Sequence, residues 1–300
     1  MIISVASGKG GTGKTTIATN LAVALGEPLQ FLDCDVEEPN AHLFLKPVMS
    51  QSLDVHLEVP EIDPARCTLC GKCQEICQFN AIAVLPAAAL NFPELCHSCG
   101  GCFLVCPEQA LISRQRRIGT VEIGARGLVR FANGRLRVGE ALAPPLIRRV
   151  REEAWEGGLT IIDAPPGTSC PVLATVQGSD LVLLVTEPTP FGLNDLELAV
   201  AAVRELRLPV GLVINRADVG DRRVHDYAAR ENLPILLEIP FDREVAKTYA
   251  QGELLVEKFP AWRSMMLALY AMIQEEVLGG RMTKAGRCGE LTPTRSPVPI

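Results

Sequence analysis

Gly8-Lys9-Gly10-Gly11-Thr12-Gly13-Lys14-Thr15-Thr16 is the stretch that decides the fold of this 300-residue chain. An apolar run, residues 1–6, precedes it, and a helical pattern follows from Thr15 to Leu25. The order is strand, glycine-rich loop, helix, and the loop matches the G-x-x-x-x-G-K-[ST] phosphate-binding pattern. Glycines let successive backbone N–H groups turn inward around an anion, and the helix adds its own free N–H groups and positive dipole end.

The pattern also assigns chemistry to side chains. Lys14 is expected to reach the β- and γ-phosphates of bound ATP, and the Thr15 hydroxyl to bind Mg²⁺. The alternative is a glycine turn with a surface lysine, which leaves the strand before the loop and the helix after it without a role. The residues expected to bind the nucleotide phosphates are Gly8, Gly10, Gly11, Thr12, Gly13, Lys14, Thr15 and Thr16.

The position of Lys9 narrows the class of ATPase. A lysine directly after the first glycine resembles the deviant P-loop of the MinD/ParA/Mrp/nitrogenase-iron-protein group. In that group, this lysine reaches across a dimer to the partner's nucleotide. The resemblance therefore implies a homodimer with ATP between the protomers and a catalytic role for Lys9, whereas the plain alternative is a solvated lysine.

Composition and charge exclude several classes of protein. The net charge of −6 argues against a nucleic-acid binder, which usually has a basic domain. The sequence has no uncharged apolar stretch long enough to span a membrane and starts without a signal-peptide pattern, so we expect a cytoplasmic protein without stable membrane insertion. Eleven cysteines in a cytoplasmic chain indicate metal or redox chemistry rather than disulfides.

Acidic residues follow two predicted buried strands. Asp33 and Asp35 end the run at residues 29–35, and Asp163 ends the run at residues 159–163. Ligands of open α/β sheets bind at the carboxyl ends of strands, so these carboxylates should face the P-loop. We expect Asp35 and Asp163 on the Mg²⁺ side and Asp33 to orient the attacking water. The alternative for Asp33 and Asp35 is to cap a helix or turn.

Two loops resemble the switch regions of the same ATPase group. Residues 33–40 resemble switch I, and Asp163-x-Pro-Pro-Gly167-Thr168 resembles switch II of the Mrp branch. The resemblance implies that the Gly167 N–H contacts the γ-phosphate. Cys170 follows this loop, either as an unligated thiol or with a role between subunits, as in the nitrogenase iron protein.

A cysteine repeat occupies the middle of the chain. Cysteines with x₂, x₂ and x₃ spacing occur in two blocks that lie 29 residues apart. This is the pattern of a two-cluster bacterial ferredoxin, in which the fourth cysteine of each block binds the other cluster. The resemblance assigns one [4Fe–4S] cluster to Cys67, Cys70, Cys73 and Cys106, and the other to Cys96, Cys99, Cys102 and Cys77.

Two features qualify this assignment. Gln78 stands where ferredoxins usually have proline, which removes no ligand. Paired zinc sites are the alternative, but they leave the third closely spaced cysteine and the 29-residue symmetry unexplained.

Three further apolar runs, residues 181–185, 210–214 and 235–239, predict more buried parallel strands. Polar or turn residues follow two of them at positions that match the family's adenine-binding segments. The Asn215 amide is expected to pair with the adenine edge, with helix capping as its alternative. The loop expected to form a wall beside the adenine ring contains Pro240, Phe241 and Asp242.

These segments predict an α/β fold with a mostly parallel P-loop sheet and a small inserted α+β ferredoxin-like domain. We expect the ATPase domain at residues 1–59 and 114–280, and the inserted domain at 60–113. An antiparallel ribbon is expected near 118–140 with a tight turn at Asn133-Gly134. An apolar helix at 261–278 should pack in the core, and the polar tail, 281–300, should be disordered.

Three functions fit this arrangement. The first is an ATPase that couples nucleotide state to electron transfer through two [4Fe–4S] clusters, with a redox partner. The second is a protein that assembles or carries iron–sulfur clusters or other metallocofactors. The third, a MinD/ParA-type positioning switch, is disfavoured by the acidic charge and by the absence of a periodic, membrane-binding C-terminal segment.

Overall fold

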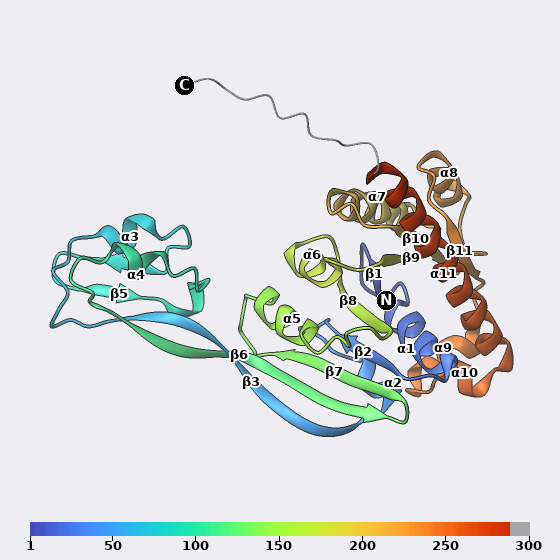
Figure 1. Cartoon of the computed structure of the whole chain (residues 1–300), viewed down its shortest axis with the longest axis horizontal. Helices are drawn as coiled ribbons and strands as arrows, with labels where there is room; N and C mark the ends of the chain where they lie inside the picture. The colour runs from blue at the N-terminus through green and yellow to red at the C-terminus, as the bar shows by residue number, and fades with distance from the viewer. Residues whose placement is uncertain (289–300) are drawn as a thin grey trace.

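The computed structural model describes residues 1–288, with side chains described through Gly279. Its main body is one nine-stranded sheet covered by helices on both faces (Figure 1). The strands are β1 (Ile2–Ser7), β2 (Leu29–Asp33), β3 (Val48–Ile62), β6 (Leu111–Arg126), β7 (Val129–Leu136), β8 (Thr160–Pro166), β9 (Leu181–Thr186), β10 (Val210–Asn215) and β11 (Ile235–Ile239).

The strand order is β11-β10-β9-β1-β8-β2-β7-β6-β3. Every neighbouring pair from β11 to β7 is parallel, whereas β6 runs antiparallel to both β7 and β3. The predicted α/β fold with a mostly parallel sheet is therefore confirmed. The carboxyl ends of the parallel strands meet at one edge, where the predicted phosphate-binding loop follows β1.

Side chains of the parallel strands alternate between two buried layers. In β1, Ile3 and Val5 pack with helices α1 (Lys14–Leu25) and α11 (Pro260–Cys288), whereas Ala6 faces the opposite layer. Because both faces are covered, the strands are almost entirely apolar. Apart from α1 and α11, the helices of the main body are α2 (Ala41–Leu45), α5 (Pro144–Arg151), α6 (Cys170–Val176), α7 (Pro190–Glu205), α8 (Arg223–Arg230), α9 (Arg243–Ala250) and α10 (Leu255–Lys258).

The cysteine-rich segment forms a separate lobe at the far end of a long antiparallel ribbon. Strands β3 and β6 pair along their whole length, from Val48 opposite Ala125 to Ile62 opposite Leu111. The ribbon carries the lobe away from the main body (Figure 1). The lobe contains α3 (Lys72–Ile76), β4 (Ile82–Val84), β5 (Ala89–Asn91), a 3₁₀ turn at Pro93–Leu95 and α4 (Gly101–Val105).

The predicted tight turn at Asn133-Gly134 is wrong. The ribbon predicted near 118–140 is present as β6 and β7, but its turn lies at residues 127–128, and Asn133 is fully buried inside β7 opposite Asp33 of β2. Gly134 occurs here because a Cβ atom would lie 2.5 Å from Val36 Cγ1. The Asn-Gly pair is therefore part of a closely packed strand. An Asn-Gly pair in a strand and one in a turn look the same in the local sequence.

The C-terminal helix is longer than the sequence predicts. Helix α11 runs to Cys288, past the end expected at Leu278 and into the segment expected to be disordered from residue 281. Its core-facing residues, among them Met266 and Ile273, are fully buried, so the expected core packing is confirmed. Residues 289–300 lie outside the described part of the chain.

We expect Gly134→Ala to lower the free energy of unfolding by ~1–3 kcal/mol, because the new methyl group would overpack a filled core. A urea titration followed by tryptophan fluorescence measures this change. Gly127→Asn is the control, because Gly127 has φ +54 with open space around it, and asparagine tolerates that conformation. Equal stabilities of the two variants would show that the contact at Gly134 is not tight.

Candidate functional site

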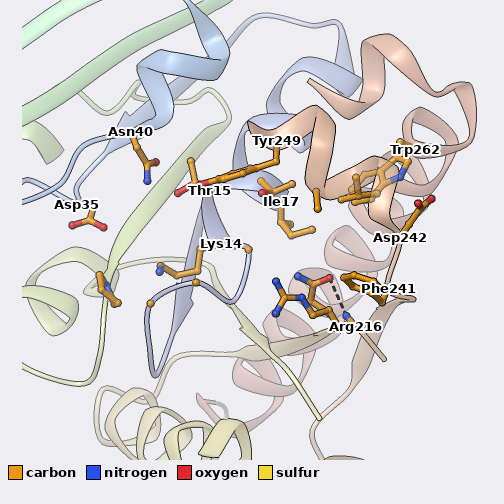
Figure 2. A pocket seen from close by; sticks show the side chains of 18 of the residues that line it. Lys14, Thr15, Ile17, Asp35, Asn40, Arg216, Phe241, Asp242, Tyr249 and Trp262 are labelled. Atoms are coloured by element: carbon orange, nitrogen blue, oxygen red, sulfur yellow. Dashed lines mark hydrogen bonds between the residues drawn. The ribbon is translucent and has the colours of Figure 1, made fainter. Parts of the chain in front are cut away.

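A pocket opens at the carboxyl edge of the parallel sheet, with a cavity volume of about 320 Å³. This volume lies in the range of small-molecule sites. Figure 2 shows Lys14 and Thr15 in the pocket with Asp35 and Asn40 beside them. Most of the predicted nucleotide-site residues line it: Gly10, Gly11, Gly13, Lys14, Thr15, Thr16, Asp35, Asn215, Pro240, Phe241 and Asp242.

Gly8, Thr12 and Gly167 are also predicted to bind the nucleotide, but they are not among the described residues that line the pocket. Gly8 packs against α7, where a Cβ atom would lie 2.2 Å from the Asp195 carbonyl oxygen. The Thr12 carbonyl accepts a hydrogen bond from Asn215 Nδ2 at 2.8 Å. The Gly167 N–H donates to the Ser7 carbonyl at 3.0 Å, and its contact with a γ-phosphate stays a prediction.

Thr15 and Asp163 form the centre of the polar site. The Thr15 hydroxyl donates to Asp163 Oδ2 at 2.5 Å, and Asp163 Oδ1 is buried without a hydrogen-bond partner among the described residues. Burial raises the pKa of Asp163 to about 7, although the Thr15 hydrogen bond and the Lys14 charge oppose the shift. A hydroxyl oxygen beside an unpartnered carboxylate oxygen fits a hard cation such as Mg²⁺.

Asp33 has surroundings different from those predicted for a water-orienting group. Its side chain is fully buried and accepts hydrogen bonds from the backbone N–H groups of Asp35, Asn40 and Ala41 at 3.0–3.2 Å. Burial raises the pKa of Asp33, and the charge of Asp163 adds to the shift. Asp33 therefore shapes the loop that follows β2, and this resembles the capping alternative.

Asp35 is the carboxylate of this loop that lines the pocket. Burial raises its pKa to about 6, and the positive charge of Lys14 opposes the shift. Desolvation is the largest cause of the elevated pKa values of Asp35 and Asp163, and the charge of Lys14 opposes both shifts. A bound cation would offset the cost of burying these carboxylates.

The far side of the pocket is lined by aromatic side chains. Phe241, Tyr249 and Trp262 line it together with Arg216 (Figure 2). Asn215 joins this side to the P-loop, because its Nδ2 binds Thr12 while its Oδ1 accepts the Arg216 N–H at 3.0 Å. The sequence analysis missed Arg216, Tyr249 and Trp262. Arg216 adjoins a predicted residue, but no local pattern marks the two aromatic residues, which tertiary packing brings there.

The cysteine lobe repeats its backbone at the 29-residue period of the sequence. Helix α3 begins at Lys72 and α4 begins at Gly101, 29 residues later. Left-handed backbone recurs at the same offset in Leu69 and Ser98, with φ of 56° and 57°. This conformation costs roughly 1–2 kcal/mol for a residue with a Cβ. Its repetition in both halves indicates a functional constraint on the backbone.

Two cavities in the lobe are each lined by four cysteines, and each is here named after one of them. The Cys67 cavity contains Cys67, Cys70, Cys73 and Cys106, whereas the Cys96 cavity contains Cys77, Cys96, Cys99 and Cys102. These are the two sets that the ferredoxin resemblance implied. Among the side chains described, those of residues 1–279, no three His, Cys, Asp or Glu side chains are arranged to hold a single metal ion.

Backbone N–H groups point at the fourth cysteine of each block. The Ala81 N–H lies 3.3 Å from Cys77 Sγ, and the Ala110 N–H lies 3.2 Å from Cys106 Sγ. Such donors stabilise a thiolate. Burial raises the pKa of Cys102 to about 11, so a metal that binds there must displace a proton. The residues present therefore fit thiolate-bound clusters.

Comparison with known proteins settles the family. Residues 3–256 match the model of the CobQ/CobB/MinD/ParA nucleotide-binding domain. The chain belongs to the CobQ/CobB/MinD/ParA nucleotide-binding family. An uncharacterized protein of Methanocaldococcus jannaschii, MJ0578, is 33% identical over 282 residues, which cover 92% of this chain and 97% of that protein.

Two further proteins that are similar to this chain carry descriptive names. The iron-sulfur cluster carrier protein of Aquifex aeolicus is 28% identical over 279 residues, which cover 86% of this chain and 62% of the carrier. The septum site-determining protein MinD of Pyrococcus horikoshii, solved with Mg-ADP, has a TM-score of 0.56 at 20% identity. That match covers 91% of this chain and 95% of MinD, and it shows the shared fold.

Lys9 lies beside the pocket of this family member. Its ammonium group is 3.6 Å from Glu187 Oε2, and its side chain is about one-third exposed. Glu187 also pairs with Arg216 at 2.9 Å. Lys9 is not among the described residues that line the pocket.

The roles of Asp33, the last residue of β2, and Asp35, just after that strand, can be distinguished experimentally. Asp33→Ala should accelerate hydrogen exchange about tenfold at the amides of Asp35, Asn40 and Ala41, because each amide loses a buried acceptor. Exchange measured by mass spectrometry reports this loss. Asp35→Ala should leave the Asn40 and Ala41 amides protected. Unchanged protection in the Asp33 variant would show that Asp33 does not hold the loop.

Proposed function

We propose that this chain is an ATP-hydrolysing protein that carries iron–sulfur clusters, received on its cysteine lobe and delivered to acceptor proteins. The observation that carries the proposal is the pair of four-cysteine cavities on a chain of a nucleotide-binding family. The carrier protein of Aquifex aeolicus, similar along most of this chain, supports cargo transfer as the use of the clusters.

The residues of the pocket supply the parts of ATP hydrolysis. Lys14 lies at the start of α1, where its charge and the helix N–H groups would bind the β- and γ-phosphates. Thr15 and Asp163 would hold Mg²⁺, which neutralises charge on the phosphate oxygens when bound. Since the oxygens of Asp33 bind backbone amides, Asp35 is the group we assign to orienting the attacking water.

The dimer expected from Lys9 is part of the proposal. Lys9 is partly exposed and lies outside the pocket lining, so it is free to leave Glu187 for a nucleotide on a second protomer. Such a dimer would form when ATP binds and separate after hydrolysis. In this scheme, nucleotide state controls when the lobe meets its acceptor.

A second function, ATP-gated electron transfer, is favoured by one observation. Each cavity already has four cysteines from the same chain, so a cluster bound there needs no ligand from an acceptor. Clusters held in this way suit a resident role in electron transfer. The two functions differ in whether the clusters leave the protein.

Anaerobic loading with iron and sulfide followed by transfer distinguishes the two functions. We expect the loaded protein to contain two [4Fe–4S] clusters and to pass them to an apo-ferredoxin faster with ATP than with a non-hydrolysable analogue. Cys70→Ser should lower iron content, whereas Cys170→Ser, in an exposed thiol outside both cavities, should not. Clusters that stay on the protein and cycle between redox states would favour electron transfer. Protein that contains zinc in tetrahedral sites, in place of iron and sulfide, would contradict both functions.

The elevated carboxyl pKa values predict how Mg·ADP binding depends on pH. Asp163 titrates at about 7 and Asp35 at about 6, so both bind protons as the pH falls below these values. The Mg²⁺-dependent part of ADP affinity should therefore fall by up to about tenfold for each pH unit below 7, because Asp163 binds the cation only when ionised. Below pH 6, loss of the nearby Asp35 charge should add to the fall. Calorimetric titrations of the protein with ADP, with and without Mg²⁺, measure the Mg²⁺-dependent part of the affinity.

Asp163→Asn is the control for that experiment, because it removes the group with the higher pKa. The variant should keep only the pH dependence of the nucleotide itself and of Asp35. A Mg²⁺ contribution that is independent of pH in the unmodified protein would show that these carboxyls do not face the cation.

A further inference from the structure

The neck between the main body and the cysteine lobe lies where β6 leaves the sheet. Pairing between β6 and β7 ends at Gly119 opposite Leu136. Toward the lobe, residues 111–117 are paired with β3 alone among the described strands. An isolated two-stranded ribbon is only marginally stable and bends easily. The orientation of the lobe therefore depends on what packs against this neck.

A buried ion pair packs there. Glu140, in the segment that links β7 to α5, pairs with Arg116 of β6; the Glu140 side chain is fully buried and that of Arg116 is 9% exposed. Glu140 also pairs with Arg137 at 3.5 Å and accepts the Leu142 N–H at 3.2 Å. Removing one partner of such a pair leaves a buried charge uncompensated, so the contact strongly resists separation.

The neighbouring ion pairs of the ribbon differ in exposure. Arg117 pairs with Asp54 and Arg114 pairs with Glu61, but each of these side chains is at least half exposed. Exposed pairs of this kind contribute about 0–1 kcal/mol. Of the ribbon arginines at positions 114, 116 and 117, Arg116 alone is buried in its ion pair.

Arg116 also contacts the lobe. Its Nη2 donates to the carbonyl oxygen of Cys96 at 3.5 Å. The Cys96 cavity is lined by Glu58 and Pro60 of β3, whereas the Cys67 cavity is lined by Ile62 at the far end of that strand. The Cys96 cavity is thus the nearer of the two to the main body, and Arg116 connects its backbone to the segment that enters α5.

We propose that Arg116, anchored by Glu140, is a positioning residue of the Cys96 cavity. It fixes the Cys96 backbone against the main body and places a positive charge beside the cluster that this cavity would hold. A nearby positive charge favours the more negative, reduced state of a cluster, so Arg116 should raise the reduction potential of a cluster in the Cys96 cavity. This inference rests on the proposed function, since it concerns a cluster in that cavity.

The first test uses the metal-free protein, so it does not depend on cluster loading. Arg116→Gln should accelerate hydrogen exchange about tenfold in peptides that contain Cys96–Ser98 and residues 137–142, because the neck loses its buried contact. Arg117→Gln, in the adjacent exposed pair, should leave both peptides unchanged. Equal exchange in the two variants would overturn the positioning role.

A second variant covers the case in which Arg116→Gln fails to fold. The double substitution Arg116→Met and Glu140→Met removes both charges together, which proteins commonly tolerate when the new side chains pack. It should reproduce the faster exchange near Cys96 while the P-loop peptides remain protected. Protection near Cys96 equal to that of the unmodified protein would contradict the proposal.

The second test is a redox titration of the loaded protein followed by electron paramagnetic resonance. In Arg116→Gln, one cluster should shift to lower potential while the other keeps its potential, and Arg117→Gln should shift neither. If both clusters load and neither moves, the inference fails and the proposed function stands. If the unmodified protein binds no clusters, the proposed function fails, and the exchange experiment still decides whether Arg116 holds the neck.

Discussion

The parallel pairing of β1 between β8 and β9 is the constraint on which the site depends. It places the P-loop between the end of β8, which bears Asp163, and the strands that lead to Asn215. The hydrogen bonds from Thr15 to Asp163 and from Asn215 to Thr12 join residues 148 and 203 positions apart. Because the carboxyl ends of parallel strands meet at one edge, one apolar sheet assembles a polar pocket from distant parts of the sequence.

Burial of this pocket explains its electrostatics. Asp33, Asp35 and Asp163 are taken out of water at neighbouring strand ends, and desolvation is the largest cause of the elevated pKa of each. Backbone amides satisfy Asp33, but Asp163 keeps an oxygen without a partner in the described structure. A site with excess buried negative charge and an unpartnered oxygen is arranged for a cation, which the phosphate-binding loop beside it would bring with a nucleotide.

Much of this could be predicted from the sequence, because the informative signals were local. The P-loop glycines and the apolar strands ending in acids each lie within a few adjacent residues, and the cysteine pattern repeats within residues 67–106. Each of these signals has a direct structural meaning. What the sequence did not predict depends on long-range packing. Strand β3 alternates apolar and polar residues over 53–59, but its place in the sheet depends on pairing with the distant β6. Asn133-Gly134 looks like a turn although Gly134 accommodates Val36. Tyr249 and Trp262 reach the pocket only through the packing of α9 and α11.

Packed elements of the main body connect the nucleotide pocket to the cysteine lobe. The loop that carries Gly167 leads directly into α6, α6 packs against α5, and α5 packs against β6 through residues such as Leu146 and Ile118. Glu140 lies just before α5 and holds Arg116 at the neck. Packed helices transmit displacements because interiors are close to incompressible. These contacts form a continuous packed route from the Gly167 loop to the end of the lobe that contains Cys96, and the buried pair at the neck completes it.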